Sequence, residues 1–364
     1  MGNLAGRRSP ARSPPGPRSE ETRVVGPTRF RVARVHTPGV LDTPEIPEGF
    51  ELRPATVHDA ESIANVTNAC MLAELGRPWT TPERALTDLT APGIDLANHL
   101  LLSRTDGAPV GYLEVTAAGE PLDEVGVLAF VDPSFWGRGF SALLLEVAES
   151  RADAIVSGAG VSGPVAFLAA RLQSNEPAGR LFASRGYTPI RTFHMMRIEL
   201  ADPPPSPSIP DGIRIRTFER DRDARSVYDA MMEAFADHWG SDPTTFEQWV
   251  HGEIDGEATF DPSLWFVAVD GDEVAGVALS AASSPRSPDT AVVAELAVRR
   301  PWRRRGLGLA LLLTAFGAFA ERRIPAAELG VDSENPTGAT RLYARAGMKP
   351  AYAWEWWRKD LTGS

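Results

Sequence analysis

A basic segment containing two glycines has the residue types that bind a phosphate or pyrophosphate group. It runs Val298-Arg299-Arg300-Pro301-Trp302-Arg303-Arg304-Arg305-Gly306-Leu307-Gly308-Leu309 and follows an apolar stretch that reads as a strand. The glycines open a predicted helix, so free backbone N–H groups and the helix dipole point at one spot beside three arginines. Glycine also lets the backbone approach an anion closely, because it has no Cβ. The segment therefore predicts an anion-binding loop.

Three alternatives share parts of this pattern. A dinucleotide-binding loop would be favoured by Glu328, about twenty residues on, but it turns directly after its strand, whereas seven residues separate Val298 from Gly306. A P-loop needs a lysine followed by serine or threonine, and Gly308 is followed by leucine and alanine. The simplest alternative is an ordinary helix start with exposed arginines.

The arrangement Arg303-x-x-Gly306-x-Gly308 resembles the (Arg/Gln)-x-x-Gly-x-(Gly/Ala) signature of the GNAT superfamily, which holds the pyrophosphate of acetyl-CoA. A second segment, Asn335 to Met348, is similar to the family's other signature, an Asn, then Leu-Tyr, then a helix-ending Gly. The resemblance implies an α/β fold with a mixed sheet and acetyl-CoA as co-substrate. It also implies coenzyme contacts from Leu296, Ala297, Val298, Arg303, Arg304, Arg305, Gly306, Leu307, Gly308, Leu309 and Asn335.

The same resemblance implies roles for two side chains in acetyl transfer to an amine. Glu295, in the strand before the loop, matches the family's general base, and Tyr343 matches its general acid for the coenzyme A thiolate. The backbone N–H of Ala297 or Val298 would stabilise charge on the carbonyl oxygen. The structural alternatives are a carboxylate on a solvated strand edge and an aromatic side chain in the core. Direct transfer needs neither a nucleophilic residue nor a metal ion.

An internal repeat accounts for most of the chain. Pro47-Glu48-Gly49 matches Pro210-Asp211-Gly212, and the turn Asp106-Gly107 matches Asp270-Gly271. Further pairs lie in the same order at nearly the same offset: Val110-Gly111 with Ala275-Gly276, Gly139 with Gly306, and Gly186 with Gly347. The spacing alone therefore predicts two tandem copies of one domain, whatever each copy does.

The first copy departs from the pattern at the positions that would carry the chemistry. The repeat places Leu128 opposite Glu295 and Phe182 opposite Tyr343, so neither counterpart can transfer a proton. Its loop, Trp136-Gly137-Arg138-Gly139, still resembles a variant of the pyrophosphate-binding signature. We therefore expect the first copy to bind coenzyme A or to support the second copy, and to be non-catalytic.

Each copy reads as mixed α/β, and the second shows which elements must position the loop. The expected strands are Ile213–Arg216, Leu264–Val269, Glu273–Leu279, Val292–Val298, Glu328–Val331 and Lys349–Arg358. The expected helices are Asp221–Ala236, Gly306–Arg323 and Thr337–Ala346. In the last strand Tyr352, Trp354 and Trp356 alternate on one face. These aromatic side chains would either contact the acceptor substrate or pack between the domains.

Composition divides the chain and limits its partners. Residues 1–46 are rich in Pro, Gly, Ser and Arg and predict a disordered basic tail, while the proline-rich residues 202–210 predict a linker between domains at 47–201 and 211–361. The formal net charge is −11, and residues 1–46 contain eight Arg and four acids, so the remainder carries −15. Such a body disfavours nucleic acid and favours an amine-bearing partner, although an acidic surface also simply promotes solubility.

The remaining features concern location and reaction class. A single cysteine excludes an intramolecular disulfide, and no apolar run approaches the ~20 residues that span a bilayer. Without a secretory h-region at the start, we expect a cytoplasmic protein that binds no membrane.

The leading hypothesis is N-acetylation of a primary amine on a small molecule by the C-terminal domain. The alternatives are a non-enzymatic acetyl-CoA-binding or scaffolding protein, and a transferase that uses charged tRNA. The oligomeric state and the acceptor are not predicted.

Overall fold

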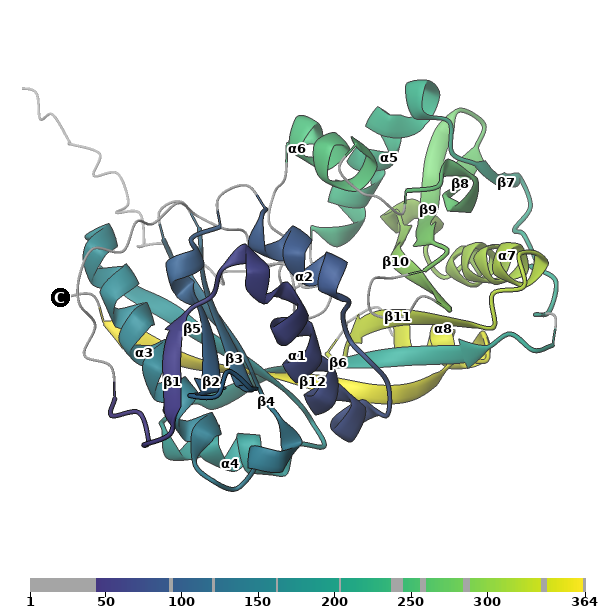
Figure 1. Cartoon of the computed structure of the whole chain (residues 1–364). Helices are drawn as coiled ribbons and strands as arrows, with labels where there is room; N and C mark the ends of the chain where they lie inside the picture. The colour runs from purple at the N-terminus through teal and green to yellow at the C-terminus, as the bar shows by residue number, and fades with distance from the viewer. Residues whose placement is uncertain are drawn as a thin grey trace, which may run out of the picture.

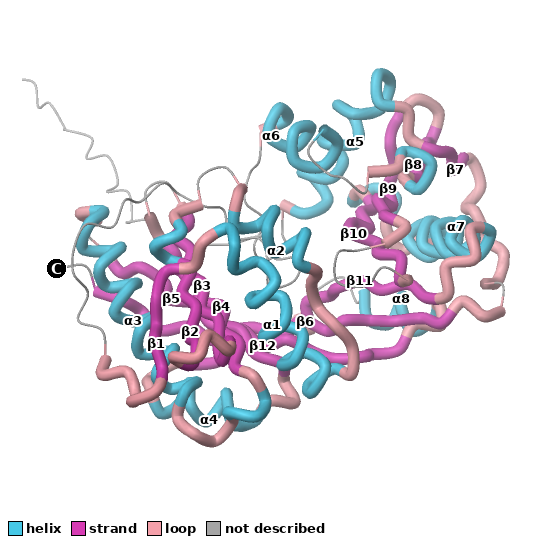
Figure 2. The backbone as a smooth tube through the Cα atoms, viewed as in Figure 1, coloured by secondary structure: helices cyan, strands magenta, loops and turns pink. Residues whose placement is uncertain are grey.

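The computed structural model describes residues 44–91, 94–119, 122–161, 163–202, 204–236, 245–255, 260–283, 289–334 and 339–362. The predicted tail lies almost wholly outside these residues, as does Asn335. Within them, no helix is both long and apolar enough to cross a membrane. Both halves show the expected alternation of helices and strands (Figures 1 and 2).

The first half contains six strands and four α-helices in its described residues. The strands are β1 (Phe50–Pro54), β2 (His99–Arg104), β3 (Pro109–Ala118), β4 (Glu124–Val131), β5 (Pro164–Leu172) and β6 (Thr188–Glu199). The helices are α1 (Ala60–Leu75), α2 (Pro82–Leu89), α3 (Phe140–Ala159) and α4 (Glu176–Ser184).

The second half repeats this order within its described residues. Its strands are β7 (Ile213–Thr217), β8 (Phe266–Asp270), β9 (Glu273–Ala281), β10 (Thr290–Val298), β11 (Ala326–Asp332) and β12 (Lys349–Thr362). Its helices are α5 (Arg220–Phe235), α6 (Phe246–Val250), α7 (Leu307–Glu321) and α8 (Ala339–Arg345). Every helix and strand predicted for this half is present, with ends shifted by a few residues.

All twelve strands form one sheet in the order β1-β2-β3-β4-β5-β12-β6-β11-β10-β9-β8-β7. Two neighbouring pairs are parallel, β4 with β5 and β10 with β11, and the others are antiparallel. The last strand of each half lies in the other half of the sheet: β12 pairs with β5, and β6 pairs with β11. Figure 1 shows these two long strands crossing the middle of the molecule. The exchange joins the two copies by main-chain hydrogen bonds.

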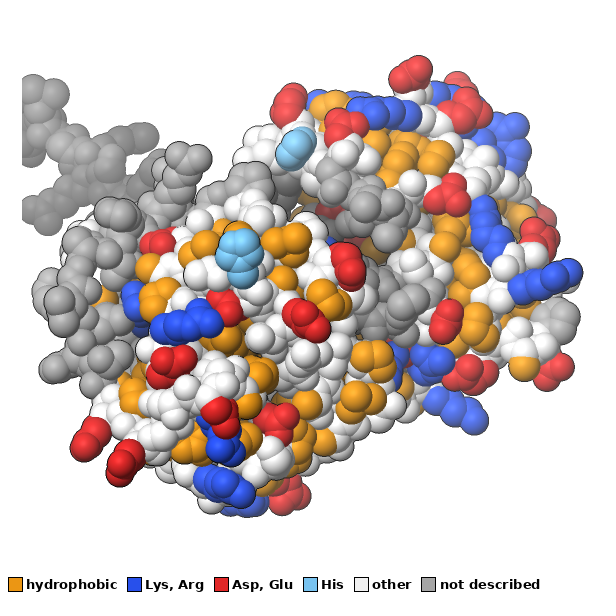
Figure 3. All heavy atoms as spheres, viewed as in Figure 1, with side chains coloured by type: hydrophobic (Ala, Val, Ile, Leu, Met, Phe, Trp, Pro, Cys, Tyr) orange, Lys and Arg blue, Asp and Glu red, His pale blue; other side chains and the backbone are white. Residues whose placement is uncertain are grey.

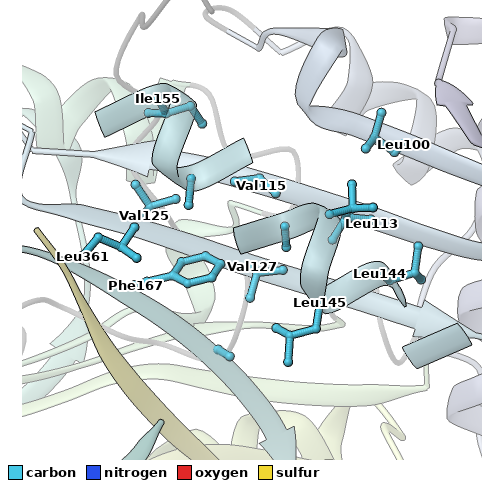
Figure 4. Packing of buried hydrophobic residues seen from close by; sticks show 14 of the residues in the cluster. Leu100, Leu113, Val115, Val125, Val127, Leu144, Leu145, Ile155, Phe167 and Leu361 are labelled. Atoms are coloured by element: carbon cyan, nitrogen blue, oxygen red, sulfur yellow. The ribbon is translucent and has the colours of Figure 1, made fainter. Parts of the chain in front are cut away.

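Helices cover both faces of the sheet. In the first half α3 packs its apolar side on one face, where Leu144, Leu145 and Ile155 meet strand residues that include Leu361 of β12 (Figure 4). The opposite face carries α1 and its own apolar cluster. In the second half α7 and α5 occupy the corresponding faces. Most residues of α7 are buried, and for this reason the helix is apolar around most of its circumference.

The aromatic side chains of β12 pack between the two copies. Trp354 is buried in the α1 cluster, with its ring centroid 5.5 Å from that of Trp79, and Tyr352 packs against the same cluster. Trp357 lies in the α3 cluster on the other face. The interpretation as inter-domain packing is therefore confirmed for these residues, because they fill the core of the first copy.

Candidate active site

The parallel strands β10 and β11 separate at the centre of the second half. They pair only from Thr290 to Val292, opposite Ala326 to Glu328, although β10 continues to Val298 and β11 to Asp332. The β9–β10 register also shifts between Val293 and Glu295, as expected for a β-bulge. Together the split and the bulge leave one edge of β10 without a strand partner among the described residues.

The direction of the hydrogen-bond ladder shows which N–H groups face this open edge. Arg299 N donates to Ala275 O, and Ala297 lies opposite Val277 in the same antiparallel ladder. Because N–H groups alternate in direction along a strand, those of Ala297 and Arg299 point towards β9, and those of Leu296 and Val298 point into the split. Of the two proposed oxyanion donors, the backbone geometry therefore favours Val298 over Ala297.

Glu295 lies immediately after the bulge, half-buried, and opposite Leu279 of β9. The side chains of Leu279 and Ala297 both belong to the apolar cluster beneath α5. Because cross-strand partners, and residues two apart on a strand, share a face, the Glu295 carboxylate is on the α5 face of the sheet. The bulge thus sets the direction of the candidate base.

Tyr343 enters from α8 and is buried, with 8% of its surface exposed. Burial is the main cause that raises its pKa to about 12, and the negative charge of Glu295 raises it further. The phenol therefore stays protonated across the physiological pH range. The structure brings Glu295 and Tyr343 close enough for the charge of one to affect the pKa of the other.

The predicted anion-binding loop lies between β10 and α7, with a 3₁₀ turn at Arg300–Trp302. Gly306 is the N-cap of α7 and has φ +87°, a left-handed conformation that side chains with a Cβ rarely adopt. A Cβ built on Gly306 would meet no atom within 4 Å, so the space beside it is open. The free N–H groups of the first helical turn point in this direction.

Two side chains of the loop hold its shape. Arg303 donates from Nε to Val298 O at 2.9 Å and from Nη2 to Ala234 O at 3.0 Å, which ties the loop to the end of β10 and to α5. Trp302 donates from Nε1 to Asp270 Oδ2 at 2.8 Å, which ties the loop to the β8–β9 turn. Arg304 and Arg305 are exposed. An anion would therefore meet the backbone and these last two arginines more readily than Arg303.

The remaining predicted contacts divide by burial. Leu307 is buried and Leu309 is half-buried in the α7 cluster, so these two residues can contact an anion only through their backbone N–H groups. A Cβ on Gly308 would lie 2.9 Å from Leu342 Cδ1. Gly308 therefore allows α8, which carries Tyr343, to pack closely on α7.

The first copy has the same loop geometry without the same side chains. Gly139 is the N-cap of α3 with φ +88°, and Trp136 donates from Nε1 to Val131 O at 2.8 Å, the bond that Arg303 makes in the second copy. Arg138 stacks over Phe135 at 5.3 Å, while Gly137 has φ +73°. The tryptophan thus replaces the arginine as the tie between loop and strand.

The strands of the first copy also separate, but without a bulge. β4 and β5 pair only from Glu124 to Val127, and β3 pairs with β4 in continuous register. Leu128 and Phe182 occupy the positions of Glu295 and Tyr343, as the repeat predicts. The Cys70 thiol is buried and hydrogen-bonds the backbone of Val131, the counterpart of Val298.

A contact that the sequence did not indicate joins the first copy to this part of the second. Arg77, just after α1, donates from Nη1 and Nη2 to the two carboxylate oxygens of Glu328 at 2.8 and 3.0 Å and to Tyr352 OH at 2.9 Å. Arg197 of β6 contacts the same carboxylate at 2.8 Å. Glu328, the acid considered for a dinucleotide site, is therefore held by two arginines where β11 leaves β10.

Replacing Arg77 with alanine is expected to lower the free energy of unfolding by about 1–3 kcal/mol, because Glu328 is buried and would lose a bidentate partner. Arg180→Ala is the matched control, since Arg180 and its partner Glu176 are both largely exposed. That control should change stability by less than about 0.5 kcal/mol. Urea unfolding of both variants measures the difference, and equal midpoints would contradict a structural role for the Arg77 contact.

Comparison with known proteins agrees with this geometry. The model of the "Acetyltransferase (GNAT) family" matches residues 62–187 and 224–348. A mycothiol acetyltransferase of Thermobispora bispora is 31% identical over 297 residues, covering 80% of this chain and 93% of the relative.

Solved structures show the same tandem organisation. A GCN5-related N-acetyltransferase from Sphaerobacter thermophilus has a TM-score of 0.75 and 33% identity, covering 88% of this chain and 98% of that one. A tandem GNAT protein from the clavulanic acid biosynthesis pathway shares the fold at a TM-score of 0.61 and 18% identity, covering 86% and 99%. On the family match to both halves and on the relatives that span most of its length, this chain belongs to the GNAT family of acetyltransferases.

Proposed function

We propose that the C-terminal copy transfers the acetyl group of acetyl-CoA directly to a primary amine on a small molecule. The observation that supports this most is the meeting of Glu295 and Tyr343 beside the split between β10 and β11, next to the Gly306 loop. The curated relatives are mycothiol acetyltransferases, so the amine that those enzymes acetylate is the first candidate acceptor.

Acetyl-CoA would supply a thioester whose carbonyl carbon accepts the amine. The backbone N–H groups of Leu307, Gly308 and Leu309 are placed to hold its pyrophosphate, because they open α7 and face the space beside Gly306. The N–H groups of Leu296 and Val298 line the open edge of β10. One of them, Val298 in our assignment, would stabilise the negative charge that develops on the carbonyl oxygen.

Glu295 would accept a proton from the amine, which is an ammonium ion at neutral pH and cannot attack until it is deprotonated. A carboxylate does this directly or through one water molecule. The position of Glu295 after the bulge, on the α5 face, supports the role because α5 and α6 cover the side from which an acceptor would approach.

Tyr343 would donate a proton to the departing coenzyme A thiolate. A phenol with a pKa of about 12 gives up its proton reluctantly to a thiolate, because the thiol that forms has an ordinary pKa near ~8.5. However, the Glu295 charge is one cause of that high pKa, and this charge disappears once Glu295 has taken the amine's proton. Deprotonation of the amine would therefore make Tyr343 a stronger acid for the step that follows.

Tyr343→Phe is expected to lower kcat about 10²-fold while leaving the affinity for acetyl-CoA unchanged, because the ring remains and only the proton donor is lost. Steady-state turnover and calorimetric titration together measure this. Tyr228→Phe on α5, a half-buried tyrosine, is a suitable control. Undiminished turnover in Tyr343→Phe would contradict the assignment of the acid.

The function itself is tested by following the release of coenzyme A from acetyl-CoA with a panel of amines. The panel should include the acceptor of the mycothiol acetyltransferases, glucosamine, spermidine and short peptides. We expect amine-dependent turnover that Glu295→Gln lowers strongly. Tight binding of acetyl-CoA without turnover of any amine would instead support the alternative, a non-enzymatic acetyl-CoA-binding or scaffolding protein.

A further inference from the structure

One cross-strand pair differs between the two copies in a reciprocal way. In the second copy Glu295 of β10 lies directly opposite Leu279 of β9. In the first copy the corresponding pair is Leu128 of β4 and Glu114 of β3. The two pairs are equivalent because each lies three residues from a matched pair, Gly276 with Val298 and Gly111 with Val131. The carboxylate has therefore moved across the pair to the neighbouring strand, and the leucine has moved the other way.

This exchange keeps a carboxylate in the corresponding cross-strand pair, one strand further from the split. Directly opposite residues in an antiparallel pair have Cβ atoms about 5 Å apart, a distance that a glutamate side chain spans. Leu128 packs against the α1 cluster, as does Tyr112, two residues before Glu114 on β3. Glu114 is therefore on the α1 face, which corresponds to the α5 face that carries Glu295 in the second copy.

The surroundings of Glu114 differ from those of three other buried or partly buried carboxylates and resemble those of Glu74, which accepts a hydrogen bond from the neutral Asn175 amide. Asp223, Glu328 and Glu355 each form an ion pair with an arginine. Glu114 accepts a hydrogen bond from a phenol: Tyr112 OH donates to its Oε2 at 3.3 Å, and no cation pairs with this carboxylate among the described residues. A carboxylate that serves only to hold the structure would gain more from an arginine than from this single neutral donor.

A second hydrogen bond extends this contact into the core. His99 Nδ1 lies 2.7 Å from Tyr112 OH. Since an ionised carboxylate only accepts, Tyr112 donates to Glu114, and His99 in turn donates from Nδ1–H to the tyrosine oxygen. The three side chains form a line, His99 to Tyr112 to Glu114, that orients the carboxylate.

The proton affinity of this carboxylate suits a base. Burial, followed by the nearby charge of Asp88 on α2, raises the pKa of Glu114 to about 7, and the hydrogen bond from Tyr112 opposes the rise. Burial lowers the pKa of His99 to about 4, so its ring is neutral at physiological pH. A general base is most effective when its pKa lies close to the working pH.

The first copy also keeps the features that would bind the acyl-CoA donor. β4 and β5 separate after Val127, as β10 and β11 do. α3 begins at Gly139 with the loop conformation of Gly306, and a Cβ on Gly139 would meet no atom within 4 Å. Glu114 therefore lies on the strand next to β4, and β4 borders the same kind of split, beside the same kind of loop, as β10 does in the second copy.

We propose that the first copy is a second site of amine acylation, in which Glu114 of β3 is the proton acceptor. The proposal rests on the proposed function, since it assumes the same donor class, an acyl-CoA thioester, and a primary amine. Glu114 takes one proton from the ammonium group and later releases it to solvent. The nitrogen then forms a bond to the carbonyl carbon, the carbon–sulfur bond breaks, and the sulfur leaves with the electron pair and gains the second nitrogen proton. The products are an N-acyl amine, coenzyme A and one proton.

The second site is expected to be slower than the first. Phe182 occupies the position of the acid, and the Cys70 thiol hydrogen-bonds the backbone of Val131, the counterpart of Val298. The sequence predicts no catalysis in this copy because the repeat places Leu128 opposite Glu295. On the preceding strand the repeat aligns Gly111 with Gly276 and therefore Glu114 with Leu279, which is the sequence signal for a carboxylate here.

The test is made in a full-length double variant carrying Glu295→Gln and Gly306→Val. The second change should stop the C-terminal copy from binding acetyl-CoA, so that the remaining turnover belongs to the first copy. Release of coenzyme A from acetyl-CoA is followed with glucosamine, spermidine, 2-aminoethanol and short peptides. We expect slow, amine-dependent release that Glu114→Gln lowers at least ~10²-fold. Glu61→Gln, the same change at an exposed residue of α1, should leave the residual rate unchanged.

A pH profile gives a readout that does not depend on the folding of a Glu114 variant. In the double variant, where the C-terminal copy no longer contributes, the residual rate should fall below about pH 7, because Glu114 must be ionised to accept a proton. Tyr112→Phe removes the hydrogen bond that lowers the pKa of Glu114, so the midpoint should move to higher pH. A purely structural tyrosine would not move it.

Two results would overturn the proposal: equal residual rates with and without Glu114→Gln, or no residual turnover of any amine in the double variant when the wild type is active. Failure of the proposed function has a different signature, a wild-type rate that Glu295→Gln does not lower. The Glu114 comparison stays valid in that case, because both of its proteins carry the same substitution at Glu295.

Discussion

Glu295→Gln is expected to lower kcat/KM for the amine by about 10²–10⁴-fold, the usual contribution of a positioned general base. Glutamine keeps the size of the side chain and removes its ability to accept a proton, so the amine must arrive already neutral. The rate should then rise with pH until the amine itself is deprotonated. Affinity for acetyl-CoA should not change, because the loop and the edge of β10 are intact.

The measurement is steady-state turnover between about pH 6 and pH 10, with acetyl-CoA binding followed by calorimetry. Glu321→Gln is the matched control, because Glu321 ends α7 on the exposed surface, far along the helix from Gly306. A Glu295→Gln enzyme with the wild-type rate and pH profile would exclude Glu295 as the base.

Gly306→Val is expected to abolish the binding of acetyl-CoA to the C-terminal copy. The backbone at Gly306 has φ +87°, where a β-branched residue is strongly disfavoured, so valine would force the loop into another conformation. The N–H groups of the first turn of α7 would then no longer converge. A valine that kept the conformation would instead place its methyl groups in the space beside Gly306 that is open in the structure.

Gly317→Ala separates this effect from a general effect of losing a glycine on α7. A Cβ on Gly317 would meet no atom within 4 Å, and Gly317 is not among the glycines with positive φ. Alanine there should stabilise the helix by up to ~1 kcal/mol and leave binding unchanged. The readouts are KM for acetyl-CoA and calorimetric affinity. Wild-type values in Gly306→Val would show that the loop does not hold the coenzyme.

Charge is the weakest of the sequence arguments for a substrate. On the face drawn in Figure 3, acidic and basic side chains are interspersed rather than gathered in a patch of one sign. Many of the acids form ion pairs with arginine, as Asp223 does with Arg216 and Glu355 with Arg171. The net charge of −11 therefore says little about the acceptor, and the argument for an amine rests on Glu295, Tyr343 and the relatives.

Local sequence features predicted the position and shape of the anion-binding loop because they depend on neighbouring residues. Gly306 and Gly139 take left-handed conformations at matched helix starts, and the apolar periodicity of α7 fixes the face that it buries. The predicted contact at Asn335 lies outside the described residues and stays a prediction. The structural role of Arg303 was harder to predict from the sequence, because its partners, the carbonyl oxygens of Val298 and Ala234, come together only in the folded chain.

The sequence by itself determined that the chain contains two copies of one domain and where most helices and strands of the second copy lie. These follow from spacing and periodicity, which a single chain records directly. The resemblance to the GNAT signatures added that the positions of Glu295 and Tyr343 are matched in the second copy alone. Only the tertiary structure decided that β6 and β12 exchange places, because two strands of similar pattern can pair in either half and the choice depends on contacts distant in sequence. It also decided which residues lie opposite each other in the sheet, because a residue's neighbour across a sheet is set by register. Register shows that Leu128 of β4, at the position of Glu295, lies directly opposite Glu114 of β3.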